Sequence, residues 1–177
     1  FEYVSGLRKT KRLEIKLLLA ASFASVLLQP LSGLPFFVDL WGETEGGKSV
    51  TLAVAASVWA CPEENTYIKD YKGTDVGLEV ICDLLNHLPL ILDEFQMVKN
   101  KKDFEGIVYM LAEGIGKGRG AKSGGVRETP TWKNCILTSG EMPITNFMTG
   151  AGAFNRIVEI ECTKKLFPDP MAVLAAV

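Results

Sequence analysis

Residues 36–49 read Phe36-Phe37-Val38-Asp39-Leu40-Trp41-Gly42-Glu43-Thr44-Glu45-Gly46-Gly47-Lys48-Ser49. The first part is a short, mostly apolar run between Pro35 and Gly42, which predicts a buried strand. The second part matches the pattern G-x-x-x-x-G-K-[ST] at every defined position. Small residues and good helix formers then continue from Lys48 to Ala60. A strand, a glycine-rich loop and a helix in this order predict an α/β fold with a phosphate-binding loop.

The loop has the residue types that phosphate binding requires. Glycines let the backbone curl so that successive N–H groups converge on phosphate oxygens, and the start of the helix adds its positive dipole end. We expect Lys48 to reach the β- and γ-phosphates of ATP and Ser49 to offer its hydroxyl to Mg²⁺. The predicted nucleotide-binding residues are Gly42, Glu43, Thr44, Glu45, Gly46, Gly47, Lys48, Ser49 and Val50. The alternative is a glycine-rich turn that fits the pattern by chance.

A pair of acids follows a second apolar run, in Leu90-Ile91-Leu92-Asp93-Glu94. Such a strand delivers carboxylates to the C-terminal edge of a parallel sheet, where ligands collect. We expect Asp93 to hold the Mg²⁺ shell and Glu94 to act as the general base on the attacking water. Adjacent acids after a strand also occur on ordinary protein surfaces, which is the alternative.

The remaining elements alternate between helix and strand. Further helices are predicted over residues 12–28, 75–86 and 104–113, with Asp75 as a plausible N-cap, and further strands over 66–69, 88–92, 135–138 and 157–160. This alternation indicates a P-loop NTPase with a parallel five-stranded sheet sandwiched by helices. Residues 1–33 are expected to form a helical segment that packs on the core, residues 34–177. The chain starts at Phe1 without a Met, so we expect a piece of a longer protein.

Composition sets limits on partners and location. The net charge of −2 gives no overall attraction to nucleic acid, so DNA binding would need a local cluster of cations. The apolar stretch over residues 17–28 is too short to cross a bilayer, so no membrane partner is expected. The four cysteines have no C-x-x-C spacing and lie in or beside apolar runs. They are interpreted as buried free thiols, which suits a reducing cytoplasm.

Two later strands are flanked by residues that can act on a nucleotide. The strand over residues 135–138 leads to Ser139, whose hydroxyl can bond the γ-phosphate or the lytic water; the alternative is a hydroxyl that caps a turn. Arg156 precedes the last strand, where it can neutralise transition-state charge, most usefully on a neighbour's nucleotide. The alternative for Arg156 is a surface ion pair with Glu159 or Glu161.

This set of motifs resembles the AAA+ core of helicase superfamily III. More narrowly, it is similar to the phage- and mobile-element domain-of-unknown-function family 927. The stretches that carry the resemblance are residues 40–42, 47–49, 55–59, 74–79, 92–94, 108–114, 116–119, 132 and 137–141.

The resemblance implies an ATP-driven motor on replicating DNA, built as a homo-oligomeric ring, a hexamer, with nucleotide sites between subunits. In one respect the sequence departs from that superfamily, which usually carries a sensor Asn after the fourth strand where this chain has Thr138-Ser139-Gly140. Ser139 is therefore the best candidate for the sensor. Because the chain ends soon after its fifth predicted strand, a lid with a second sensor Arg is expected to be absent or vestigial.

A glycine-rich basic loop precedes the fourth predicted strand. Its cations are Lys117, Arg119, Lys122 and Arg127. In the resembled helicases a hairpin at this place projects into the ring's channel and touches the DNA backbone. These side chains suit sequence-independent contacts to the phosphates of single-stranded or forked DNA. The alternative is a solvated surface loop.

Two functions therefore stand. The first is an ATP-hydrolysing DNA helicase or translocase that acts in replication of a phage or mobile element. The second is a P-loop ATPase that remodels or switches a protein partner without binding DNA. The basic loop favours the first, and a P-loop kinase is disfavoured because adjacent acids suit water activation.

Overall fold

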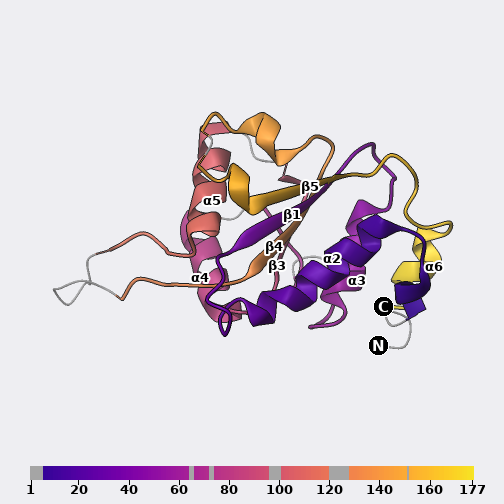
Figure 1. The fold of residues 1–177 in the computed structure, drawn as a ribbon, viewed down its shortest axis with the longest axis horizontal. Helices are drawn as coiled ribbons and strands as arrows, with labels where there is room; N and C mark the ends of the chain where they lie inside the picture. The colour runs from indigo at the N-terminus through magenta and orange to yellow at the C-terminus, as the bar shows by residue number, and fades with distance from the viewer. Residues whose placement is uncertain (1–5, 64–65, 72–73, 96–100, 120–127, 151) are drawn as a thin grey trace.

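The computed structural model describes residues 6–63, 66–71, 74–95, 101–119, 128–150 and 152–177 (Figure 1). The helices are α2 (Leu13–Ala24), α3 (Lys48–Ala56), α4 (Asp75–Leu85), α5 (Lys101–Glu113) and α6 (Pro170–Leu174). The strands are β1 (Phe36–Trp41), β2 (Lys69–Asp70), β3 (Leu90–Asp93), β4 (Cys135–Gly140) and β5 (Ile157–Glu161). Short 3₁₀ turns are η1 (Leu7–Lys9), η2 (Ser25–Leu27), η4 (Ile144–Phe147) and η5 (Phe154–Arg156).

The strands form one five-stranded sheet in the order β2-β3-β4-β1-β5, and every pairing is parallel. The predicted α/β fold with a parallel five-stranded sheet is therefore confirmed. β4 lies between β1 and β3, so the end of β4 is inserted between the phosphate loop and the acidic pair. Since all strands run the same way, their C-terminal ends meet at one edge.

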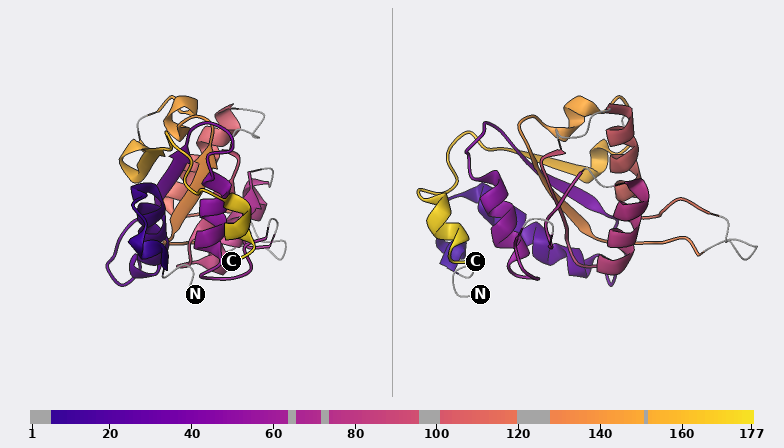
Figure 2. Two further views of the ribbon diagram at one scale, coloured as in Figure 1. Left: turned by 90° about the vertical axis from the view of Figure 1, so that its right-hand side faces the viewer. Right: turned by 180° about the vertical axis from the view of Figure 1, so that it is seen from behind.

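Helices cover both faces of the sheet, as the apolar strands require. Side chains alternate along each strand: Val38 and Leu40 join the cluster under α2 and α3, whereas Phe37 joins the cluster under α4 and α5. Figure 1 and Figure 2 show these helix pairs on opposite sides of the strands. The helix α2 packs against α3, β4 and β1. Among the described residues no helix combines the length and apolarity needed to cross a bilayer.

Several predicted boundaries are wrong by a few residues. The first helix ends at Ala24 and continues as the 3₁₀ turn η2, and α3 ends at Ala56 rather than Ala60. Strand β2 begins only at Lys69, later than predicted. Strand β3 begins after Pro89, which has no N–H for a ladder bond. Strand β4 extends to Gly140 and so includes Ser139.

Two predictions about single residues are also wrong. The N-cap of α4 is Thr74, whose Oγ1 accepts a hydrogen bond from Gly77 N at 3.1 Å, and Asp75 lies in the first turn instead. All four cysteines are free, but Cys61 is exposed because it lies beyond the end of α3, directly before Pro62.

Candidate functional site: a phosphate-loop cavity and a basic arm

The phosphate loop joins the end of β1 to the start of α3. Gly42 has φ 146° and Gly47 has φ 88°, values that favour glycine. A Cβ atom on Gly42 would lie 2.8 Å from the carbonyl oxygen of Cys162, so a side chain has no room there. Gly47 is the N-cap of α3, and the loop therefore wraps the positive end of that helix.

Lys48 is the first residue of α3 and is 8% exposed. Its Nζ donates hydrogen bonds to the carbonyl oxygens of Gly42 at 2.9 Å and Glu43 at 2.7 Å. An ammonium has three N–H donors, so these two bonds fix its position and still allow one more acceptor. Main-chain N–H groups, a helix N-terminus and a fixed ammonium together suit a phosphate chain.

A cavity of about 310 Å³ opens over the loop. Its lining brings together residues from the loop and from the ends of β3 and β4: Thr44, Glu45, Gly46, Gly47, Lys48, Ser49, Val50, Glu94, Ser139, Gly140, Glu141 and Pro170. Among these described residues Lys48 is the only cation. The predicted residues Lys48, Ser49, Glu94 and Ser139 thus share one cavity.

The acidic pair lies at the end of β3. Asp93 Oδ1 accepts hydrogen bonds from the backbone N–H of Glu94 at 3.0 Å and from the hydroxyl of Ser139. Glu94 adopts φ 56°, a left-handed conformation that costs a non-glycine residue about 1–3 kcal/mol. This backbone geometry accompanies an exposed carboxylate at the cavity wall. The two acids therefore have different surroundings: Asp93 is bonded to β4, and Glu94 faces the cavity.

The hydroxyls of Thr138 and Ser139, at the end of β4, face opposite sides of the sheet. Ser139 is 3% exposed and lines the cavity, whereas Thr138 accepts a hydrogen bond from the Tyr71 hydroxyl at 3.1 Å. The strand's alternation thus puts Ser139, and not Thr138, beside the acidic pair.

Sequence reasoning did not single out two features of the cavity. Glu141 follows β4 and accepts a hydrogen bond from the Thr44 hydroxyl at 2.9 Å, so it ties the phosphate loop to β4. The position of Glu141 shortly after a predicted strand could have identified it from the sequence as a candidate site residue. The segment after β5 also borders the loop, because Leu166 N donates to Gly46 O at 2.9 Å and Pro170 lines the cavity. No motif or spacing in that segment predicted this contact.

Arg156 lies at the other edge of the sheet. It directly precedes β5, whose Ile157 pairs with Phe37 near the start of β1, whereas the phosphate loop follows the end of β1. Its guanidinium donates a hydrogen bond to the carbonyl oxygen of Ala112 on α5. Within one chain the structure therefore does not bring Arg156 to the cavity.

A buried acid, Asp39, occupies the middle of β1. It is fully buried; its Oδ2 accepts from Ile144 N at 3.3 Å, and its Oδ1 has no partner among the described atoms. Burial raises the pKa of Asp39 to about 8, and the nearby Glu159 adds to the rise while Lys48 opposes it. Glu159 in turn accepts from the backbone and hydroxyl of Thr145. Asp39 faces the α4 and α5 side and is absent from the cavity lining.

The described part of the basic loop forms the base of a projecting arm. Residues 114–119 and 128–132 run side by side away from the body of the fold (Figures 1 and 2), and we call them the arm. Ile115 and Thr131 form an antiparallel bridge. Two of the predicted nucleic-acid residues, Lys122 and Arg127, lie outside the described residues.

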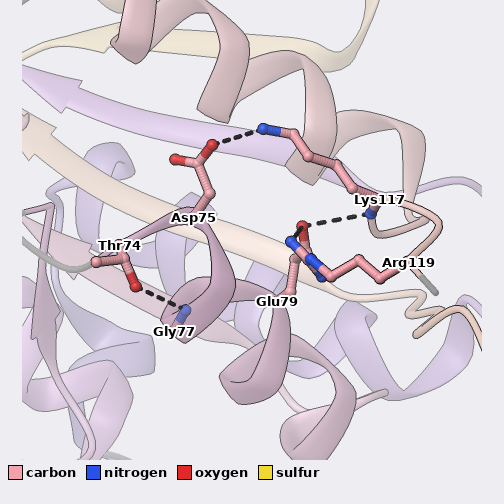
Figure 3. A network of polar contacts seen from close by, with 6 residues as sticks. All are labelled: Thr74, Asp75, Gly77, Glu79, Lys117 and Arg119. Atoms are coloured by element: carbon pink, nitrogen blue, oxygen red, sulfur yellow. Dashed lines mark hydrogen bonds and ion pairs between the residues drawn. The ribbon is translucent and has the colours of Figure 1, made fainter. Parts of the chain in front are cut away.

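The other two cations of the arm contact α4 (Figure 3). Lys117 Nζ lies 2.6 Å from Asp75 Oδ2, and the guanidinium of Arg119 bonds both carboxylate oxygens of Glu79. The Arg119 hydrogen bond lowers the pKa of Glu79, and Asp75 raises that of Lys117. Both cations are thus paired with acids in this structure.

The sheet and the glycine-rich loop between β1 and α3 define the class: this is a P-loop NTPase-like fold. The chain belongs to the family described as Domain of unknown function (DUF927), whose sequence model matches residues 2–131. The resemblance to family 927 is thereby confirmed. No curated protein matches the sequence.

Among solved structures the chain is similar to one described as "SCCmec type IV Cch - active helicase", with a TM-score of 0.70 and 20% sequence identity. The match covers 97% of this chain and 31% of that chain, so this chain spans about a third of its length. At this identity the likeness shows the shared fold.

Proposed function

We propose that this chain is the ATP-hydrolysing motor domain of a DNA helicase or translocase that acts in replication of a phage or mobile element. The carrying observation is the cavity where Lys48, Ser49, Glu94 and Ser139 meet. A buried ammonium, a carboxylate and a hydroxyl around one cavity suit the hydrolysis of a phosphate chain. The helicase named among the solved structures supports the choice of motor.

Each residue of the cavity then has a role. Backbone N–H groups of residues 44–50, which line the cavity, bind the phosphates, and Lys48 neutralises charge on the β- and γ-phosphates. The predicted residues Gly42 and Glu43 lie outside the cavity lining, and Gly42 N donates instead to Gly140 O at 3.2 Å. Ser49 and Asp93 hold Mg²⁺, which when bound neutralises the developing phosphate charge. Glu94 takes the proton of the attacking water. Ser139, bonded to Asp93, is the sensor.

The AAA+ assignment of the helicase superfamily III kind rests on the placement of β4 between β1 and β3, which lets a hydroxyl reach between the phosphate loop and the acids. Arg156, distant from the cavity of its own chain, acts on the nucleotide of a neighbouring subunit. This action requires an oligomer, and we propose that the oligomer is a homo-oligomeric ring, a hexamer. We also propose the predicted division into a helical segment, residues 1–33, of which residues 1–5 lie outside the described part, and a core, residues 34–177, on which α2 packs. The four free cysteines of the chain suit a protein that acts in the reducing cytoplasm.

A second candidate is an ATPase that remodels or switches a protein partner. The observation that favours it is the pairing of Lys117 and Arg119 with acids of α4, which reduces the positive charge available to DNA. Under this function the arm contacts a protein.

One experiment separates the candidates: the ATPase rate of the full-length protein, measured with and without single-stranded DNA. The motor on DNA predicts stimulation by DNA that Lys48→Ala abolishes, and a remodelling ATPase predicts hydrolysis that DNA does not change. If the full-length protein neither binds nor hydrolyses ATP, both candidates are wrong.

A further inference from the structure

The arm is held to α4 through its base. Its two segments are joined by hydrogen bonds from Gly116 N to Pro130 O at 2.8 Å and from Trp132 N to Gly114 O at 2.9 Å. Figure 3 shows Lys117 and Arg119 reaching from this base to acids on α4. The two cations were predicted to have the same role, but their surroundings differ.

The pair between Arg119 and Glu79 is built around a buried carboxylate. Glu79 is 1% exposed, and both of its oxygens accept from the Arg119 guanidinium. Lys117 N also donates to Glu79 Oε1 at 3.3 Å. A Cβ atom on Gly116 would lie 3.0 Å from Glu79 Oε2, so the main chain of the arm lies directly on this carboxylate. Removing the guanidinium would leave the Glu79 carboxylate with the Lys117 N–H as its remaining hydrogen-bond donor among the described atoms.

The pair between Lys117 and Asp75 is exposed. The side chains are 61% and 44% exposed, and the contact is a single one at 2.6 Å. Ion pairs in such surroundings contribute little and weaken with salt. A phosphate oxygen can therefore replace Asp75 at low cost.

We propose that Arg119 is a positioning residue that anchors the arm to α4 through Glu79, and that Lys117 is the cation that leaves Asp75 for a nucleic-acid phosphate. The second half rests on the proposed DNA function, whereas the first half does not.

The anchor is tested without DNA, by amide hydrogen exchange of peptides that cover residues 114–119 in the full-length protein. Arg119→Gln should speed exchange there by at least about tenfold, because it releases the arm from a buried carboxylate. Lys117→Gln should change it by less than about threefold. The double variant Glu79→Gln/Arg119→Gln removes both charges and should recover part of the protection. Equal exchange in Arg119→Gln and Lys117→Gln would overturn the anchor.

The transfer of Lys117 from Asp75 to a phosphate is tested by the salt dependence of binding to labelled single-stranded DNA. Lys117→Gln should lower the log-log slope by about 0.7, the value of one phosphate contact. Arg119→Gln should lower the slope by less than Lys117→Gln does, because an Arg119 that stays on Glu79 contacts no phosphate. Lys164→Gln, which removes an exposed charge from the segment after β5, is the matched control.

The outcomes distinguish the role of Arg119 as an anchor from the role of Lys117 as a phosphate contact. A decrease of the slope in Arg119→Gln as large as that in Lys117→Gln would mean that Arg119 also leaves its acid for a phosphate, and would overturn the anchor. No binding of DNA by the parent protein would overturn the role of Lys117 together with the proposed DNA function. The exchange experiment would then still decide the role of Arg119.

Discussion

The hydroxyl of Ser139, at the end of β4, donates a hydrogen bond to Oδ1 of Asp93, at the end of β3. The same oxygen accepts from the backbone N–H of Glu94, so one carboxylate atom organises both strand ends. Asp93 is thereby oriented beside the cavity, and Glu94 is held in a left-handed conformation next to it. A second link, from Thr44 to Glu141, ties the phosphate loop to β4.

Ser139→Ala should slow ATP hydrolysis and lower the apparent affinity for Mg²⁺ by about 10–100-fold, the range for losing a partner that orients a metal ligand. The reason is that Asp93 would keep only the Glu94 backbone bond. The measurement is ATPase rate against Mg²⁺ concentration. Thr138→Val is the matched control, since it removes a hydroxyl from the opposite face; equal Mg²⁺ effects in both variants would count against Ser139.

Lys48→Ala should abolish useful ATP binding. The cavity would lose its ammonium, and Lys48 is the only cation among the described residues that line it. Isothermal titration calorimetry with ATP and Mg²⁺ measures this directly. Lys164→Ala, which removes an exposed charge from the segment after β5, should bind ATP as the parent does. Parental affinity in Lys48→Ala would refute the phosphate-loop assignment.

Glu94→Gln should retain ATP but slow hydrolysis by about 10²–10⁴-fold, as expected for loss of a general base. The amide keeps the size of the side chain and removes its basicity. Glu141 and Glu45 are the other carboxylates of the cavity lining, so Glu141→Gln and Glu45→Gln should be measured beside it. A larger loss in Glu141→Gln than in Glu94→Gln would transfer the role of base to Glu141.

Local chemistry made part of this architecture predictable. The bounds of β1 agree with the prediction because Pro35 and Gly42 frame its apolar run. The phosphate-loop residues are contiguous, so their meeting in one place required no knowledge of the tertiary fold. Ser139 was chosen from a run of polar residues, and only the alternation within β4 separates it from Thr138.

The rest depends on long-range packing that no local pattern encodes. The pair Glu79 and Arg119 joins residues 40 positions apart, and the basic run alone looked free to bind phosphate. The contact of Arg156 with Ala112 replaces the ion pair with Glu159 or Glu161 that sequence offered as an alternative. The periodicity of apolar residues also cannot predict the strand order, in which β4 lies between β1 and β3.

Asp39 should make the protein less stable as pH rises. Its folded pKa, about 8, lies above the ordinary value of 3.8, so the folded state binds more protons between these two values. Stability therefore falls across this window, by at most about 1.4 kcal/mol per pH unit. Urea unfolding at pH 5.5 and 8.5 measures the change. Asp39→Asn still accepts from Ile144 N and should lose this dependence; an unchanged pH profile in the variant would show that Asp39 is not its source.

Arg156→Ala should leave the nucleotide affinity of the isolated chain intact and lower hydrolysis in the assembled protein. The basis is its position at the sheet edge away from the cavity, where it contacts Ala112 and not the phosphate loop. An Arg acting on a neighbour's nucleotide stabilises the transition state without contributing to binding within its own subunit. The measurements are ATP affinity by calorimetry and turnover at concentrations where assembly is verified.

Mixing Arg156→Ala with Lys48→Ala gives the sharper test of action between subunits. Each variant alone lacks one half of every site, but a mixed ring contains interfaces that pair an intact phosphate loop with an intact Arg156. Part of the activity should therefore return on mixing, and the returned fraction should follow the mixing ratio. Verified mixed assemblies without any recovery would rule out action between subunits, and a loss of ATP affinity in Arg156→Ala alone would point to a role within the fold.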